Sequence, residues 1–143
     1  NWASISVREG VEIADRVYGL CNDQGTRVQH ILYDAEDVAL LARLQAEGVV
    51  RAGQVDRLFV LGRYATGQES APDDLDQFPQ ESGPWMLCAF GAKEHACLLK
   101  AARQGGDVRV GFENSLTDSS GQTWANNAAS VEALVSLIKG EQE

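Results

Sequence analysis

The sequence predicts an α/β fold with a parallel sheet, whose strand–helix units look like the C-terminal half of a (β/α)8 TIM barrel. Apolar runs centred near residues 30, 60, 87 and 110 recur roughly every 25–30 residues, each followed by a helical pattern, which is typical of parallel βαβ units. The 143 residues are about half of the roughly 250 in a full barrel. The sequence also lacks GxGxxG and GxxxxGK[ST], one of which an open doubly wound sheet would usually carry. We therefore expect residues 1–143 to be half of one barrel domain.

The first unit is predicted from its periodicity and its turn residues. Apolar residues at helical spacing predict a helix over residues 6–24, ended by a glycine. The β-branched and aromatic run at 28–33 predicts a strand. Asp34 is the expected N-cap of the next helix, with a second aspartate three residues on, and Gly48 is its expected C′ residue.

The remaining elements follow the same alternation of apolar runs with helical patterns. Each boundary is marked by glycine, proline or a polar cluster. In order, we expect a strand over 57–62, a short helix near 72–78, a strand over 85–90, a helix over 92–103, a strand over 107–113 and a helix over 127–139.

Composition and charge exclude several classes of protein. Apolar residues make up 44% and charged residues 23%, which is ordinary globular usage and not that of a disordered chain. A net charge of −9, from 12 basic and 21 acidic residues, repels phosphate backbones, so we expect no nucleic-acid partner. No apolar run approaches the roughly 18–20 residues of a membrane span. Three cysteines without CxxC spacing predict reduced thiols and a cytoplasmic protein.

The predicted strand at 107–113 carries the candidate site. Side chains alternate faces along a strand, so Arg109, Gly111 and Glu113 would share one face, with the two charges roughly 13 Å apart. Asn114 follows at the carboxyl end, where barrel active sites are built. Two charges on a buried strand indicate either a binding site or a buried polar network, and spacing alone leaves both open.

The same segment carries a family resemblance. The GGDVRVGFEN run at 105–114 resembles the GGHVRVGxEDN segment of the β-keto acid cleavage enzymes, whose founding activity is 3-keto-5-aminohexanoate cleavage. Residues 126–128 resemble the start of the family's next helix, and 29–34 its PExExFD-like strand end. Residues 61–62 and 90–91 resemble its sixth and seventh strand ends. The resemblance covers nearly the whole chain, but only the last third contains a motif specific to the family.

The resemblance implies a specific reaction and cofactor. The family consists of zinc-dependent, usually oligomeric barrels that combine a β-keto acid with acetyl-CoA to give acetoacetate and a new CoA thioester. Zinc acts as a Lewis acid on the keto oxygen and is held by an HxH pair and by the glutamate that falls on Glu113. Arg109 falls on the arginine that orients the substrate carboxylate, as a bidentate guanidinium can. No HxH pair occurs in the 143 residues, so we expect the histidine ligands outside them.

Two positions depart from the family pattern. Asn114 stands where the family has an aspartate, its candidate general base, and an amide has no useful basicity. The chemistry at this catalytic position is therefore expected to be altered. Gln29 stands where the first glutamate of the PExE pattern falls, and we assign it to substrate binding.

Other candidates and other functions stay open. Arg63, at a strand end, could meet a CoA phosphate or could be a solvent-facing loop arginine. We expect His30 to be a buried core histidine more often than a metal or substrate ligand, and His95 to be a surface or rim residue. The alternatives to β-keto acid cleavage are another barrel enzyme that holds a carboxylate or phosphate on Arg109, and a non-catalytic barrel remnant in which Arg109 and Glu113 are structural partners.

Overall fold

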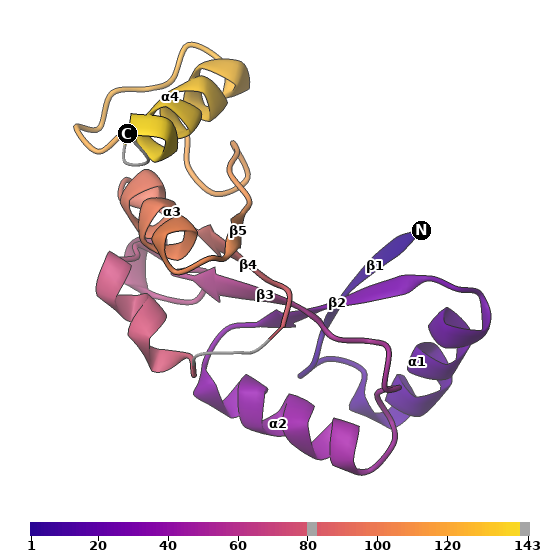
Figure 1. Cartoon of the computed structure of the whole chain (residues 1–143). Helices are drawn as coiled ribbons and strands as arrows, with labels where there is room; N and C mark the ends of the chain where they lie inside the picture. The colour runs from indigo at the N-terminus through magenta and orange to yellow at the C-terminus, as the bar shows by residue number, and fades with distance from the viewer. Residues whose placement is uncertain (80–82, 141–143) are drawn as a thin grey trace. The chain divides into compact units, whose positions relative to one another are not determined.

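The computed structural model describes residues 1–79 and 83–140, so positions 80–82 of the expected loop and residues 141–143 lie outside the described residues. Within them, five strands form one sheet in the order β1-β2-β3-β4-β5, and the pairs β1/β2, β2/β3 and β4/β5 run parallel. In chain order the elements are β1 (Trp2–Ser6), η1 (Val11–Ile13), α1 (Ala14–Asp23), β2 (Arg27–Leu32), α2 (Ala35–Ala46), β3 (Asp56–Leu61), η2 (Thr66–Gln68), η3 (Pro72–Gln77), β4 (Trp85–Ala89), α3 (Glu94–Arg103), β5 (Asp107–Val108) and α4 (Asn127–Gly140) (Figure 1).

The alternation of strands with helices confirms the α/β prediction. A parallel five-stranded sheet is consistent with part of a TIM-like barrel, while closure into a (β/α)8 barrel stays a prediction. The chain divides into two compact units: unit 1 comprises Asn1–Phe59 and Phe78–Trp85, and unit 2 comprises Val60–Gln77 and the rest of the chain from Met86. Among the described residues, none of the helices combines the length and apolar character needed to cross a membrane.

The first element differs from its prediction. Residues 6–24 are not one helix, because β1 ends at Ser6 and α1 begins only at Ala14. β1 pairs in parallel with β2, with Trp2 opposite Arg27. Gly10 then takes a left-handed φ of 62°, which separates the strand from the helical turns that follow. β1 forms because it pairs with β2, and a local apolar pattern cannot predict pairing with a segment elsewhere in the chain.

Unit 1 has its core where α1 and α2 pack on β2. Asp34 caps α2 as predicted, because its side chain accepts a hydrogen bond from the N–H of Asp37 at 3.0 Å. The buried apolar side chains of these three elements include Tyr18, Val28, Leu32, Leu41 and Leu44.

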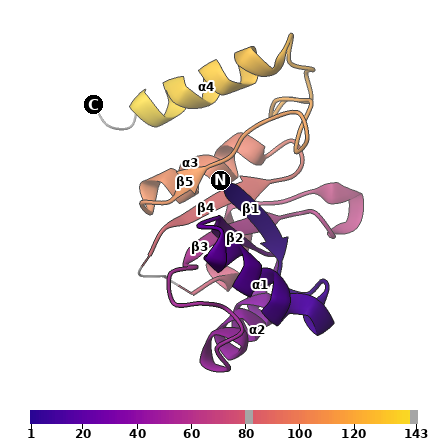
Figure 2. The same ribbon diagram turned by 90° about the vertical axis from the view of Figure 1, so that its right-hand side faces the viewer.

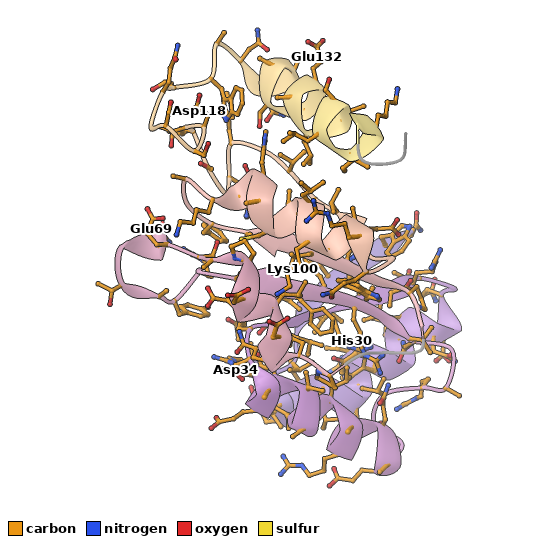
Figure 3. All side chains as sticks on the ribbon, turned by 60° about the vertical axis from the view of Figure 1, so that its left-hand side comes forward. His30, Asp34, Glu69, Lys100, Asp118 and Glu132 are labelled. Atoms are coloured by element: carbon orange, nitrogen blue, oxygen red, sulfur yellow. The ribbon has the colours of Figure 1, made fainter. Side chains whose placement is uncertain are left out.

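His30, labelled in Figure 3, is a fully buried residue of unit 1, with an exposed fraction of 0%. Its Nδ1 lies 3.3 Å from the Tyr18 hydroxyl, and its Nε2 lies 2.9 Å from the Gln54 carbonyl oxygen. Burial lowers the pKa of the imidazole, which favours the neutral ring. The interpretation of His30 as a core histidine is therefore confirmed.

Unit 2 is organised around α3, which contacts η3, β5 and α4 (Figures 1 and 2). One face of α3 is buried, and its members are spaced at three to four residues, as expected for an amphipathic helix. The Lys100 ammonium joins α3 to η3 through Asp73 at 3.3 Å and Asp76 at 2.7 Å. The buried face of α3 consists of Glu94, Cys97, Leu98 and Ala101.

Candidate functional site

The chain turns immediately after β5, and this turn shapes the candidate site. The Arg109 N–H still donates to the Leu87 carbonyl of β4 at 2.9 Å. The chain then bends back, because the N–H groups of Asn114 and Ser115 both donate to the Gly111 carbonyl, at 2.9 and 3.2 Å. The prediction of a strand through Glu113 is therefore wrong, since β5 ends at Val108.

Because of this turn, Arg109 and Glu113 contact each other instead of lying 13 Å apart on an extended strand. Arg109 Nη2 donates to Glu113 Oε2 at 2.6 Å. The side chains are 38% and 74% exposed, so the pair contributes only about 0–1 kcal/mol of net stability. A pair as weak as this can exchange its partners for a bound anion or cation at little cost.

Asn114, by contrast, is buried, with an exposed fraction of 7%. Its backbone carbonyl accepts a hydrogen bond from the N–H of Gly91, just after β4, at 3.2 Å. Its Nδ2 is buried and has no hydrogen-bond partner among the described residues. The side chain can donate a hydrogen bond, but it cannot take a proton from a substrate.

Glu94, the first residue of α3, is a second buried polar group beside this turn. It is 1% exposed, and its Oε1 accepts a hydrogen bond from the Gly111 N–H at 3.2 Å. Its Oε2 is buried without a partner among the described residues. Burial raises the pKa of this carboxyl to about 7, although the Gly111 hydrogen bond acts to lower it. Glu94 is therefore poised to exchange a proton near neutral pH.

Four hydrogen bonds join Glu94 and Asn114 into a closed ring, which we call the Glu94 ring. The Glu94 N–H donates to the Gly91 carbonyl at 3.0 Å, and the Gly91 N–H donates to the Asn114 carbonyl at 3.2 Å. The Asn114 N–H donates to the Gly111 carbonyl at 2.9 Å, and the Gly111 N–H closes the ring on Glu94 Oε1 at 3.2 Å. The ring connects the end of β4, the start of α3 and the turn after β5.

Cys88 lies in β4 near the same groups and is 1% exposed. Burial raises the pKa of its thiol to about 11, while the charges of Arg109 and Glu113 act on that pKa in opposite directions. The thiol is therefore protonated at neutral pH and is a poor nucleophile. It contributes packing to the site, as expected for a small core residue.

The loop after β3 lies tightly against the ends of β3 and β4, at the two glycines that the sequence marks as strand ends. A Cβ at Gly62 would lie 2.9 Å from the Glu69 carbonyl oxygen, and a Cβ at Gly91 would lie 2.6 Å from Glu69 Oε2. The Ser70 hydroxyl anchors the loop by donating to the Phe90 carbonyl at 2.7 Å. This approach places the exposed carboxylate of Glu69 (Figure 3) at the carboxyl end of β4.

The other two predicted binding residues lie in different units. Arg63 of unit 2 is exposed, and its guanidinium carbon lies 5.6 Å from the centroid of the Phe90 ring. Gln29 belongs to unit 1 and is the third residue of β2, where its Oε1 accepts a hydrogen bond from Ser4 Oγ at 3.3 Å. Arg109, Glu113 and Asn114 are thus brought together, while the substrate-binding roles of Arg63 and Gln29 stay predictions.

The strand ends of unit 1 carry a charged cluster that sequence reasoning did not single out. Arg8, two residues after β1, bonds to Asp34 at 2.7 Å and to Asp37 Oδ1 at 2.8 Å. Asp37 is 3% exposed and also accepts from the Tyr33 N–H at 2.7 Å. The cluster fixes the chain where β2 passes into α2.

A structural or catalytic zinc centre needs three or four protein ligands close together. In residues 1–79 and 83–140, no group of three or more His, Cys, Asp or Glu side chains is placed to hold a metal ion. Glu113 offers one carboxylate, but these residues do not form a zinc site by themselves.

The parallel α/β sheet carries an accessible Arg–Glu pair just beyond β5, at the strand edge where barrel enzymes build their active sites. The family model described as beta-keto acid cleavage enzyme matches residues 2–142. The chain therefore belongs to the beta-keto acid cleavage enzyme family, as the GGDVRVGFEN segment predicts. A search of curated proteins gave no match.

Sequence reasoning did not identify Glu94 as part of the site, although a signal for it is present. Glu94 shares the spacing of Cys97, Leu98 and Ala101, so it belongs to the buried face of α3. A carboxyl at a buried helix position, just after a strand end, is a candidate functional group. Its partner Gly111 lies in another element, however, and the contact requires the fold.

Proposed function

We propose that this chain is part of an enzyme that combines a β-keto acid with acetyl-CoA to give acetoacetate and a new CoA thioester. Family membership supports β-keto acid cleavage as the reaction type. The observation that carries the proposal is the exposed Arg109–Glu113 pair, held at 2.6 Å just beyond β5. It offers a cation for the substrate carboxylate and a carboxylate for a metal within one short turn.

Arg109 is the proposed binding group for the β-keto acid. Its guanidinium can accept a carboxylate in bidentate geometry, and only Nη2 is engaged with Glu113 in the structure described here. A substrate carboxylate can therefore add to the pair or displace Glu113 from it. Arg63 is the proposed contact for a CoA phosphate, and Gln29 a proposed substrate contact.

Glu113 is the proposed ligand of a zinc ion whose histidine ligands come from outside the described residues. Its carboxylate is 74% exposed and so is accessible to a metal ion. In the purified full-length protein, we expect bound zinc by elemental analysis, and at least a tenfold weaker zinc affinity after Glu113→Gln. Glu47→Gln is the matched control, because Glu47 also belongs to an exposed i,i+4 pair with an arginine. Absence of zinc from the protein, or equal affinity in both variants, would overturn the assignment.

Activity tests the reaction itself. Full-length protein is incubated with acetyl-CoA and a series of β-keto acids, and acetoacetate and the new thioester are measured. Arg109→Lys is expected to raise the KM for the β-keto acid about 10–100-fold, since a charged hydrogen bond contributes about 1.5–3 kcal/mol. Arg43→Lys, in the exposed Arg43–Glu47 pair, is the control and should leave KM unchanged.

Three outcomes are informative. Turnover with a raised KM in Arg109→Lys supports the proposal. Carboxylate binding that depends on Arg109 without CoA-dependent turnover refutes it in favour of another anion-binding enzyme, and absence of both indicates a non-catalytic barrel remnant. The three free cysteines fit a reducing compartment, and we extend the proposal to a cytoplasmic homo-oligomer.

A further inference from the structure

Glu94 is the buried carboxyl that the proposed reaction leaves without a role. At 1% exposure it is among the most buried side chains of the molecule, and one of its two oxygens bonds to the Gly111 N–H. The other oxygen is buried without a partner among the described residues. An unpaired buried oxygen destabilises the fold, so its presence calls for an explanation other than packing.

The Glu94 ring shows what this carboxyl does mechanically. Three of the ring's four hydrogen bonds use backbone groups alone, and the Glu94 side chain supplies the fourth. That fourth bond is the one that ties the turn after β5 to α3. Without it, Gly111 would still accept from Asn114 within the turn, but its own N–H would lose its acceptor.

The held turn carries both members of the exposed pair. Arg109 lies two residues before Gly111, and Glu113 lies two residues after it. Their mutual contact is solvent-exposed and contributes little rigidity. The direction of both side chains therefore depends on the backbone of the turn, and a shift of about 1 Å in a binding group can cost about 100-fold in rate.

We infer that Glu94 is a positioning residue, whose carboxyl closes the Glu94 ring and thereby orients Arg109 and Glu113 for substrate and metal. The inference rests on the proposed function for its consequence in turnover, and on the geometry of the ring for its cause. Neither the family match nor the motif at 105–114 assigns a role to this side chain.

Two variants separate the carboxyl's bond from its volume. Glu94→Ala removes the acceptor for Gly111, while Glu94→Gln keeps an oxygen in the same place. In full-length protein we expect Glu94→Ala to raise the KM for the β-keto acid at least tenfold and to leave the KM for acetyl-CoA within twofold of the wild type. In Glu94→Gln, the KM for the β-keto acid should stay within about threefold of the wild type. Glu36→Ala, an exposed glutamate in the first turn of α2, is the matched control and should change neither constant.

Two NMR measurements keep the test independent of turnover. Amide exchange at Gly111 should accelerate at least tenfold in Glu94→Ala and stay near wild type in Glu94→Gln. The side-chain Nε–H signal of Arg109 should shift in Ala and not in Gln. Circular dichroism establishes that each variant is folded. If Glu94→Ala does not fold, Glu94→Asp takes its place beside Glu94→Gln, because the shorter aspartate side chain cannot reach the Gly111 N–H in the same way.

The outcomes distinguish this inference from the proposed function. If the wild type cleaves no β-keto acid, the proposed function fails, while altered Gly111 exchange and Arg109 signals in Ala still support positioning by Glu94. If Glu94→Ala leaves the amide exchange of Gly111, the Arg109 signal and the KM for the β-keto acid unchanged, the inference is overturned whatever the activity of the wild type. Equal losses of kcat in Ala and Gln, with KM unaffected, would also overturn it, because rescue by the conservative variant is required.

Discussion

The ionisation of Glu94 should make the stability of the protein depend on pH. Burial raises the pKa of this carboxyl from its ordinary 4.5 to about 7, so the folded state keeps a proton that the unfolded chain releases. The stabilising contribution is therefore fully present below about pH 4.5 and is lost as the pH rises to about 7. A pKa difference of this size corresponds to about 3 kcal/mol of unfolding free energy.

The perturbation that isolates this effect is Glu94→Gln, because glutamine keeps the shape of the protonated side chain and does not ionise. Urea unfolding of the wild type and the variant is measured at pH 4, 6 and 8. The difference in unfolding free energy, variant minus wild type, should rise by about 3 kcal/mol from pH 4 to pH 8, with most of the change between pH 5 and 7. Any constant cost of the amide cancels in this comparison.

Glu132→Gln is the control for this measurement. Glu132 is exposed on α4 (Figure 3), and the substitution removes the same charge from the same unit. Its effect should stay within a few tenths of a kcal/mol at every pH. A free-energy difference for Glu94→Gln that is constant between pH 4 and 8 would refute the reasoning, because it would mean that Glu94 ionises as easily in the folded state as in the unfolded one.

Two further predictions concern packing. Gly91→Ala should lower the unfolding free energy by about 2–4 kcal/mol in urea titrations, because Gly91 has a φ of +95° and its Cβ would lie 2.9 Å from the backbone carbonyl oxygen of Gln68. Gly105→Ala, with a φ of +82° and open space around it, should lose only about 1–2 kcal/mol, and equal losses would contradict the close approach. Alkylation of the native protein with peptide mapping should label Cys21 well before Cys88, whose thiol is buried, and simultaneous labelling would be inconsistent with that burial.

The elements that the sequence predicts well are those set by local interactions. The cap of α2 needs only Asp34 and the N–H of Asp37, three residues apart, and both are visible in the sequence. The sequence predicts the last helix over 127–139, and the helix is observed at Asn127–Gly140. The sequence does not predict β1, because this strand is supported by pairing with β2, about 25 residues further along the chain, and no local pattern reveals that pairing.

The candidate site shows the same division. The motif at 105–114 identifies Arg109 and Glu113, but an extended strand would have kept their charges apart. The turn that brings them together depends on the Gly111 carbonyl and on Glu94, which comes from another element. The sequence thus identifies the candidate residues, whereas their geometry depends on a hydrogen-bond ring with members in three elements.

The ring also gives a physical reason why an amide can stand at position 114. The side chain there is buried, and its backbone shares a ring of four hydrogen bonds with the buried carboxyl of Glu94. An aspartate at 114, as the family segment that this chain resembles carries, would add a second buried carboxyl to the residues of the ring, and burial disfavours the ionised form of such a group. An amide avoids that desolvation cost and supplies a hydrogen-bond donor instead. With an asparagine at position 114, Glu94 at the start of α3 is the one buried carboxyl of the Glu94 ring, while Glu113 in the turn after β5 is exposed.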